Sequence, residues 1–178
     1  MKKIQPKHFR ILAIAPSIRG FGFAVLEEQE TLVDWGVKTV KKGDKNKQSL
    51  AKVKKLIADY QPGVLVLEDT SAKGSRRAPR IRKLCQQIIK MTANRKVSVK
   101  LFSRDQMMKT FIADGRGTKH ALAEMIADRF PEELGSHLPP KRKPWMSEDS
   151  RMTIFDAVAL ALLPHLCRRS KSIARGRR

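Results

Sequence analysis

The sequence has few acidic residues, few aromatic residues and few cysteines. Asp and Glu number 17 against 38 Lys and Arg, so the formal net charge is +21 at pH 7. Cys85 and Cys167 have no CxxC partner and no histidine at zinc spacing, which predicts buried reduced thiols. No apolar run approaches the ~20 residues of a membrane span, and no apolar signal-peptide core follows the basic start. We therefore expect a cytoplasmic protein with no membrane partner.

The positive charge favours nucleic acid as the partner. Neutralising phosphates and releasing their counterions is the usual use of such an excess, and a basic surface that only aids solubility is the alternative. The charge gathers in residues 73–83, 141–143 and 167–178. Residues 168–178 lack apolar periodicity, which predicts a basic tail that is disordered until it meets phosphate. Residues 1–9 form a basic N-terminal extension.

The apolar pattern predicts one α/β domain over residues 10–167. The expected strands lie near 10–15, 20–27, 31–40, 63–70 and 97–102. The expected helices lie near 48–60, 78–95, 103–112, 118–130 and 149–167, and a long loop covers 131–147. Because the first three strands have short links, we expect them to pair antiparallel, with parallel crossovers after them. The result is a mixed five-stranded sheet with helices on both faces.

Two carboxylates fall where ordinary surface charges are unusual. Glu68 ends the buried strand "VLVLE", at the edge where open α/β sheets bind ligands. Asp156 lies in "TIFDAVALALL", where an ionised carboxylate needs a metal ion, a cationic partner or an altered pKa. For both acids, an ion pair with an arginine is the alternative to a functional role. Asp149 precedes Asp156 by two turns and either joins the site or caps the helix.

A third position of interest is Ala15, at the end of the first strand in "ILAIAPSIRGFGFAVLE". A carboxylate at this turn would complete a set of oxygen ligands of the kind that Mg²⁺ prefers. Two such ions about 4 Å apart activate water and stabilise the leaving oxygen in phosphodiester cleavage. Position 15 holds a methyl group instead, so the chemistry lacks one of its ligands.

These features resemble the RuvC-type Holliday junction resolvases of the ribonuclease H-like superfamily. The resemblance rests on the strand–turn–strand opening, the glutamate closing the fourth strand, the segment "FSRDQMMKTFIADGRGTKHALAEMI" and the final helix with "DAVALAL". It covers about residues 10–167. It implies a ribonuclease H-like fold and a homodimeric, nucleoid-associated endonuclease. Such an enzyme would nick branched DNA with two Mg²⁺ or Mn²⁺ ions and no organic cofactor.

Carried over by position, the resemblance makes Glu68 and Asp156 metal ligands and Ala15 the replacement of the family's first aspartate. The family's other helix acid corresponds to Thr153, and Asp149 is the candidate that could substitute for it from one turn earlier. The loss of one isolated acid predicts an inactive nuclease. It favours an engineered substitution over natural decay, in which Glu68 or Asp156 would more often be lost as well.

Three functions remain open from the sequence. The first is a structure-selective DNA endonuclease that resolves Holliday junctions or other branched DNA, inactivated here at position 15. The others are a non-catalytic nucleic-acid-binding module of the same fold and an RNA-processing nuclease, because a basic surface alone does not separate RNA from DNA. The candidate nucleic-acid contacts are basic residues and one tryptophan that either stacks on a base or anchors its loop: Arg76, Arg77, Arg80, Arg82, Lys83, Arg116, Lys119, Lys141, Arg142, Lys143 and Trp145.

Overall fold

A computed structural model of the protein describes residues 9–28, 30–112 and 115–175, with side chains through Cys167. The strands are β1 (Arg10–Ser17), β2 (Gly20–Glu27), β3 (Thr31–Thr39), β4 (Val64–Glu68) and β5 (Ser98–Phe102). The helices are α1 (Lys45–Tyr60), α2 (Pro79–Thr92), α3 (Arg104–Phe111), α4 (Lys119–Arg129), α5 (Pro131–Leu134), a 3₁₀ turn η1 (Gly135–His137) and α6 (Met152–Arg175). None of the described helices is both long and apolar enough to cross a membrane.

The strands form one mixed sheet in the order β3-β2-β1-β4-β5. β1 pairs antiparallel with β2, and β2 with β3, because their connections are too short for a crossover. β4 lies parallel to both β1 and β5, since α1 and α2 supply the crossovers. The expected five-stranded sheet with an antiparallel first half is confirmed.

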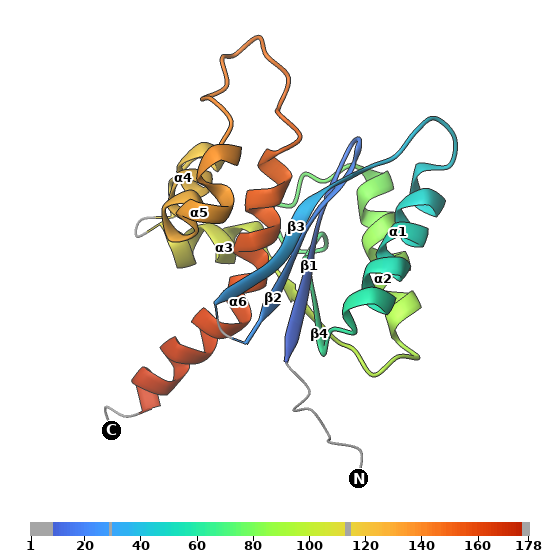
Figure 1. Ribbon diagram of the computed structural model, residues 1–178, viewed down its shortest axis with the longest axis horizontal. Helices are drawn as coiled ribbons and strands as arrows, with labels where there is room; N and C mark the ends of the chain where they lie inside the picture. The colour runs from blue at the N-terminus through green and yellow to red at the C-terminus, as the bar shows by residue number, and fades with distance from the viewer. Residues whose placement is uncertain (1–8, 29, 113–114, 176–178) are drawn as a thin grey trace.

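Helices cover both faces of this sheet (Figure 1): α6 with α3, α4 and α5 on one face, and α1 with α2 on the other. Alternate side chains of β1 serve the two cores. Ile11, Ala13 and Ala15 pack in the α6 core, whereas Leu12 and Ile14 pack in the α1–α2 core. All five are buried, which explains why β1 is an unbroken apolar run.

A glycine sets the distance between α6 and the sheet. Gly22 pairs with Ala15 across β1 and β2. A Cβ atom on Gly22 would overlap the backbone carbonyl of Thr153 in the first turn of α6. The missing side chain therefore lets the start of α6 pack directly on the strand pair that carries position 15.

Three boundaries differ from the sequence-based expectations. The segment 131–147 was expected to be a loop, but its first part forms α5 and η1, because Leu134 is buried in the α6 core. The last helix begins at Met152, after a turn closed by Asp149, and not at residue 149. It continues through Pro164 to Arg175, so residues 168–175, expected to be disordered, are helical. Residues 1–8 and 176–178 of the predicted extensions lie outside the described residues.

Candidate nucleic-acid interface and acidic site

Ala15 and Glu68 lie side by side at one edge of the sheet. The parallel register pairs Ile14 with Leu67, so the next residue of each strand brings Ala15 beside Glu68. Both face the layer of α6: Ala15 packs in that core, and Glu68 follows the alternation of β4. Asp156 reaches the same region from α6, where its charge acts on the guanidinium that binds Glu68. The structure thus brings the three positions together.

Glu68 is held by Arg77. The carboxylate is only 8% exposed. Arg77 Nε lies 3.0 Å from each of its oxygens, and Nη2 donates a further hydrogen bond to Oε2. Burial opposes the charge of the guanidinium, but the hydrogen bonds to Glu68 and the negative charges of Glu68 and Asp156 outweigh it and raise the pKa of Arg77. The expected alternative, an arginine ion pair, is what the structure contains.

Asp156 is 6% exposed and also faces cations. Lys119 Nζ lies 3.2 Å from Asp156 Oδ2, and Arg104 Nη1 lies 3.6 Å from Oδ1. Arg104 and Lys119 are the first residues of α3 and α4, whose starts are fixed by capping hydrogen bonds to the side chains of Ser103 and Thr118. Two capped helices therefore aim a cation each at the buried acid.

Asp149 and Thr153 are engaged locally. Asp149 accepts hydrogen bonds from the backbone and the guanidinium of Arg151, and the side-chain bonds lower the pKa of its carboxyl. Its carbonyl accepts from Met152 N at the start of α6. Thr153 Oγ1 donates to the Ser150 carbonyl, 2.7 Å away. Asp149 thus serves the turn before α6, which is the capping role that the sequence left open.

The residues of this region do not fit a pair of divalent ions. Such ions need several carboxylate oxygens that are free to bind them. Glu68 already accepts hydrogen bonds from Arg77, Asp156 is ion-paired with Lys119, and position 15 offers a methyl group. Across the described parts of the chain, no three His, Cys, Asp or Glu residues lie close enough together to hold a metal ion.

Two hollows flank the acids and share a wall. One, of about 300 Å³, lies between the β1–β2 turn and the start of α6 and is lined by Ile18, Asp156, Arg77 and Lys119 among others. The other, of about 810 Å³, lies beside Glu68 and the start of α3. Arg77 and Lys119 line both. The same two cations therefore contact the acids and face open space.

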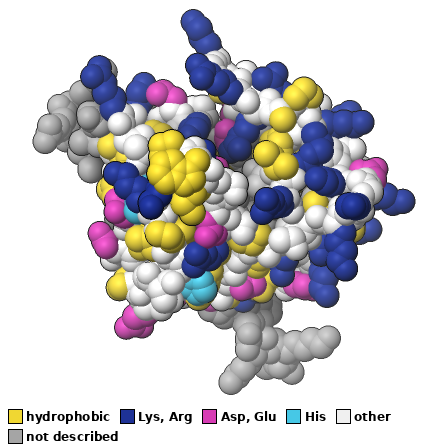
Figure 2. All heavy atoms as spheres, turned by 90° about the horizontal axis from the view of Figure 1, so that it is seen from above, with side chains coloured by type: hydrophobic (Ala, Val, Ile, Leu, Met, Phe, Trp, Pro, Cys, Tyr) yellow, Lys and Arg dark blue, Asp and Glu magenta, His cyan; other side chains and the backbone are white. Residues whose placement is uncertain are grey.

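The predicted nucleic-acid contacts gather at this end of the molecule. Figure 2 shows Lys and Arg side chains over much of the face that carries the β1–β2 turn and the 138–151 loop, with a hydrophobic patch among them. Among the predicted contacts, Arg77, Arg80 and Lys119 are half-buried, and the others are exposed: Arg76, Arg82, Lys83, Arg116, Lys141, Arg142, Lys143 and Trp145. Lys141 and Arg142 line a hollow of about 270 Å³ next to Lys119.

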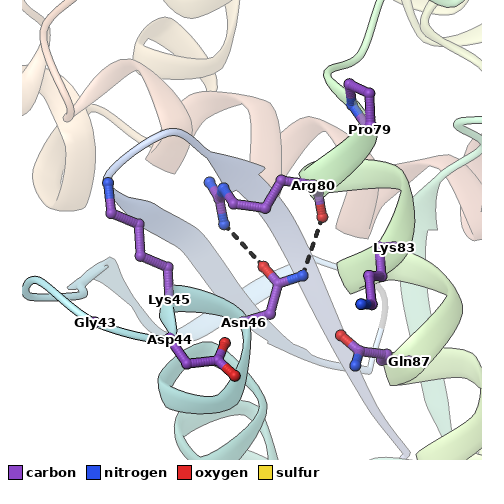
Figure 3. Close-up of a pocket in the computed structure, with 8 residues that line it drawn as sticks. All are labelled: Gly43, Asp44, Lys45, Asn46, Pro79, Arg80, Lys83 and Gln87. Carbon is purple, nitrogen blue, oxygen red and sulfur yellow. Dashed lines mark hydrogen bonds between the residues drawn. The ribbon is translucent and has the colours of Figure 1, made fainter.

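Arg80 serves the fold more than the surface. It lines a hollow of about 570 Å³ between α1 and α2. Figure 3 shows its guanidinium donating to Asn46, whose amide in turn donates to the Arg80 carbonyl. A second guanidinium nitrogen donates to the Ser17 carbonyl at 2.8 Å, which ties α2 to the β1–β2 turn. Of the basic residues that line this hollow, Lys83 is exposed, whereas Lys45 and Arg80 are half-buried.

Trp145 does not anchor its loop. It is 78% exposed, and Lys143 Nζ lies 5.6 Å from the centre of its ring. Ile18, at the tip of the β1–β2 turn, is 74% exposed and lines the smaller hollow. Large apolar side chains on a basic face are suited to stacking or wedging against bases. Of the two expected roles for Trp145, the exposed ring contradicts loop anchoring, and stacking stays a prediction.

The sequence-based reasoning missed two members of the site. Arg104 lies two residues after the end of β5, at the same sheet edge as Glu68, and that position could have indicated it. Glu148 accepts from Lys119 Nζ at 2.6 Å, and no signal in the sequence relates these two residues. Both matter because they determine the charge that surrounds Asp156.

The sequence matches no protein-family model and no curated protein. The fold matches solved structures. RuvC of Thermus thermophilus superposes with a TM-score of 0.65 at 17% identity, over 92% of this chain and 97% of that one. The same protein in complex with a Holliday junction substrate gives 0.62 at 18% identity, over 92% and 96%. This chain has the fold of the Holliday junction resolvases. The yeast mitochondrial resolvase Ydc2 also matches, with a TM-score of 0.62 at 13% identity, over 98% of this chain and 86% of that one.

Proposed function

We propose that this chain binds branched DNA, with four-way junctions preferred over linear duplex, and that it does not cleave the DNA it binds. The resolvase fold, the net charge of +21 and the basic face around the two hollows support binding. One observation carries the second half of the proposal. Glu68 accepts hydrogen bonds from Arg77, and Asp156 is ion-paired with Lys119. Ala15 supplies no third carboxylate.

We propose that the protein is related to an active endonuclease. Ala15 takes the position expected for the first acid of a structure-selective, crossover-junction endonuclease, and Glu68 and Asp156 take two further acid positions. The chain is therefore an inactive form of such an enzyme. Because the resolvase resemblance implies a homodimer and a four-way junction is symmetric, we also propose that two copies bind one junction. Light scattering of the protein with and without DNA tests that stoichiometry.

The test is competition binding at fixed ionic strength with a labelled four-way DNA junction. Unlabelled junction should displace it at a lower concentration than linear duplex or structured RNA of equal length. Incubation with Mg²⁺ or Mn²⁺ should give no paired nicks. Equal competition by duplex would overturn the junction preference, stronger competition by RNA would favour an RNA-binding role, and symmetric nicks would overturn the loss of cleavage.

A further inference from the structure

We propose that Arg77 and Lys119 take the charge positions that divalent cations would hold beside these acids, and that with Arg104 they bind a DNA backbone phosphate directly, without a metal ion. This inference rests on the proposed function, because it names how the same site holds branched DNA. It concerns the larger hollow beside Glu68, which Arg77, Arg104 and Lys119 line.

Arg77 and Lys119 each contact an acid and also face open space. In a two-metal site, cations lie between carboxylates and phosphate oxygens. Here Arg77 contacts Glu68, and Lys119 contacts both Asp156 and Glu148. The two basic side chains also line the larger hollow. Each cation thus has an acid on one side and open space on the other. That is the placement a bridging metal ion would need.

The guanidinium groups of Arg77 and Arg104 each have an N–H donor that makes no hydrogen bond to the described residues. Arg77 uses Nε and Nη2 on Glu68, while Nη1 makes no hydrogen bond to any described residue. Arg104 Nη1 is buried and likewise lacks a hydrogen-bond partner among the described residues. Buried donors without acceptors cost free energy until an acceptor arrives. Guanidinium groups bind phosphate oxygens well, because their N–H donors match the spacing of two oxygens.

The lining of the larger hollow has more basic than acidic residues. Five Lys or Arg residues line the larger hollow against three Asp or Glu residues. The five basic residues are Lys73, Arg76, Arg77, Arg104 and Lys119, which leaves the lining with a net positive charge. A dianionic metal cage attracts Mg²⁺, whereas a hollow with surplus positive charge repels it and attracts phosphate.

Ala15 is 3% exposed and lies beside Glu68 on the same face of the sheet. A carboxylate placed there would meet Arg77 and form a further ion pair before it met a metal ion. The single change Ala15→Asp is therefore not sufficient to create a metal site while Arg77 is present.

The first experiment uses the chain as it is. Junction affinity is measured in EDTA and in Mg²⁺ at matched ionic strength, with linear duplex as the control for counterion competition. Mn²⁺ alone is titrated into the protein by calorimetry. The expected results are a junction affinity that changes no more than the duplex affinity does, and no Mn²⁺ binding in the micromolar range. A junction affinity at least tenfold higher with Mg²⁺, or micromolar Mn²⁺ binding, overturns the inference.

The second experiment uses variants. Lys119→Gln and Arg77→Gln should each weaken junction binding in EDTA by about tenfold and lower the slope of log affinity against log salt by about one. Lys54→Gln, an exposed lysine on α1, is the control for loss of one charge. Ala15→Asp should leave Mn²⁺ binding absent, and Ala15→Asp with Arg77→Gln should introduce it. Mn²⁺ binding by Ala15→Asp alone, or Lys119→Gln behaving as Lys54→Gln, overturns the inference.

Different results would overturn the proposed function and the metal-independent phosphate site. Loss of junction preference over duplex removes the proposed function. Retained junction preference that depends on Mg²⁺ removes only the metal-independent phosphate site. If Arg77→Gln does not fold, the Lys119→Gln variant and the Mn²⁺ titration of the unchanged chain still decide the matter.

Discussion

The carbonyl of Thr153 lies where a side chain of Gly22 would be, so α6 contacts β2 through backbone atoms. Any side chain at position 22 must push the start of α6 away from the sheet. Asp156 lies one turn further along this helix, so the same displacement would move an acid of the site.

We therefore expect Gly22→Ala to lower the free energy of unfolding by about 1–3 kcal/mol. The measurement is urea unfolding followed by circular dichroism. Gly135→Ala is the matched control, because nothing lies within 4 Å of a Cβ there and its backbone is helical. Equal stability of the two variants would contradict the close packing of α6 on β2.

The Arg77–Glu68 pair should behave as a coupled unit. Removing one partner of a buried ion pair leaves an uncompensated charge, so Arg77→Leu should cost about 3 kcal/mol of stability. The double variant Arg77→Leu with Glu68→Leu should lose less than Arg77→Leu alone, since no buried charge is left. A double-mutant cycle in urea measures this coupling, and simple additivity of the two changes would show that the pair is not formed.

We expect substitution of Arg80 to lower thermal stability and substitution of Lys83 to lower DNA affinity. Arg80→Gln removes hydrogen bonds to Asn46 and Ser17, so it should lower the midpoint of thermal unfolding. Lys83→Gln should leave that midpoint unchanged and weaken DNA binding, with a smaller dependence on salt. If both variants lower stability equally, or Arg80→Gln changes only binding, the assignment of Arg80 to the fold is wrong.

Trp145 should contribute to binding without contributing to folding. Because its ring is exposed beside Lys143, Trp145→Ala should not change the unfolding midpoint. Loss of base stacking should weaken junction binding by about 1–3 kcal/mol. Met125→Ala on α4, which also removes an exposed apolar side chain, is the control. Equal affinities of the two variants would exclude a stacking role.

Cys85 should make stability fall at alkaline pH. Burial, and then the negative charge of Glu68, raise the pKa of its thiol to about 11. The unfolded chain ionises this thiol near about pH 8.5, whereas the folded chain keeps it protonated. The stabilisation is therefore complete below the unfolded pKa and is lost as pH rises towards the folded pKa.

The measurement for Cys85 is the free energy of unfolding from about pH 8.5 upwards, compared with Cys85→Ala. The difference between the two proteins should change with pH in the direction that makes the unchanged chain less stable. A constant difference would place the thiol in a less buried environment. The comparison cancels the titration of the lysines and of the single tyrosine, Tyr60, which both proteins share.

The sheet and the position of its acids were predictable because they follow from local patterns. The short links of the first three strands set their direction, and the run ending at Glu68 set the edge where Ala15 also lies. The basic partners of these acids were harder to predict from the sequence. Arg104 and Lys119 reach Asp156 only because two helix starts are capped at the right places in space, and this depends on tertiary packing.

Asp149 illustrates the limit of periodicity. Counting back two turns from Asp156 placed it on the helix, but its side chain and carbonyl close the turn that precedes Met152. Helix starts depend on such hydrogen bonds, which apolar spacing does not record. The helical residues 168–175 were missed for a similar reason, since they continue α6 without an apolar pattern of their own.

The ion pairs also bear on the origin of the alanine that the sequence has at position 15. Sequence-based reasoning favoured deliberate substitution, because a decaying nuclease would lose its remaining acids too. In this fold Glu68 and Asp156 are buried counter-ions of Arg77, Lys119 and Arg104, so their replacement would leave cations uncompensated in the interior. Under the proposed function, the need for a stable fold alone is enough to retain these acids, so their presence is no evidence of cleavage.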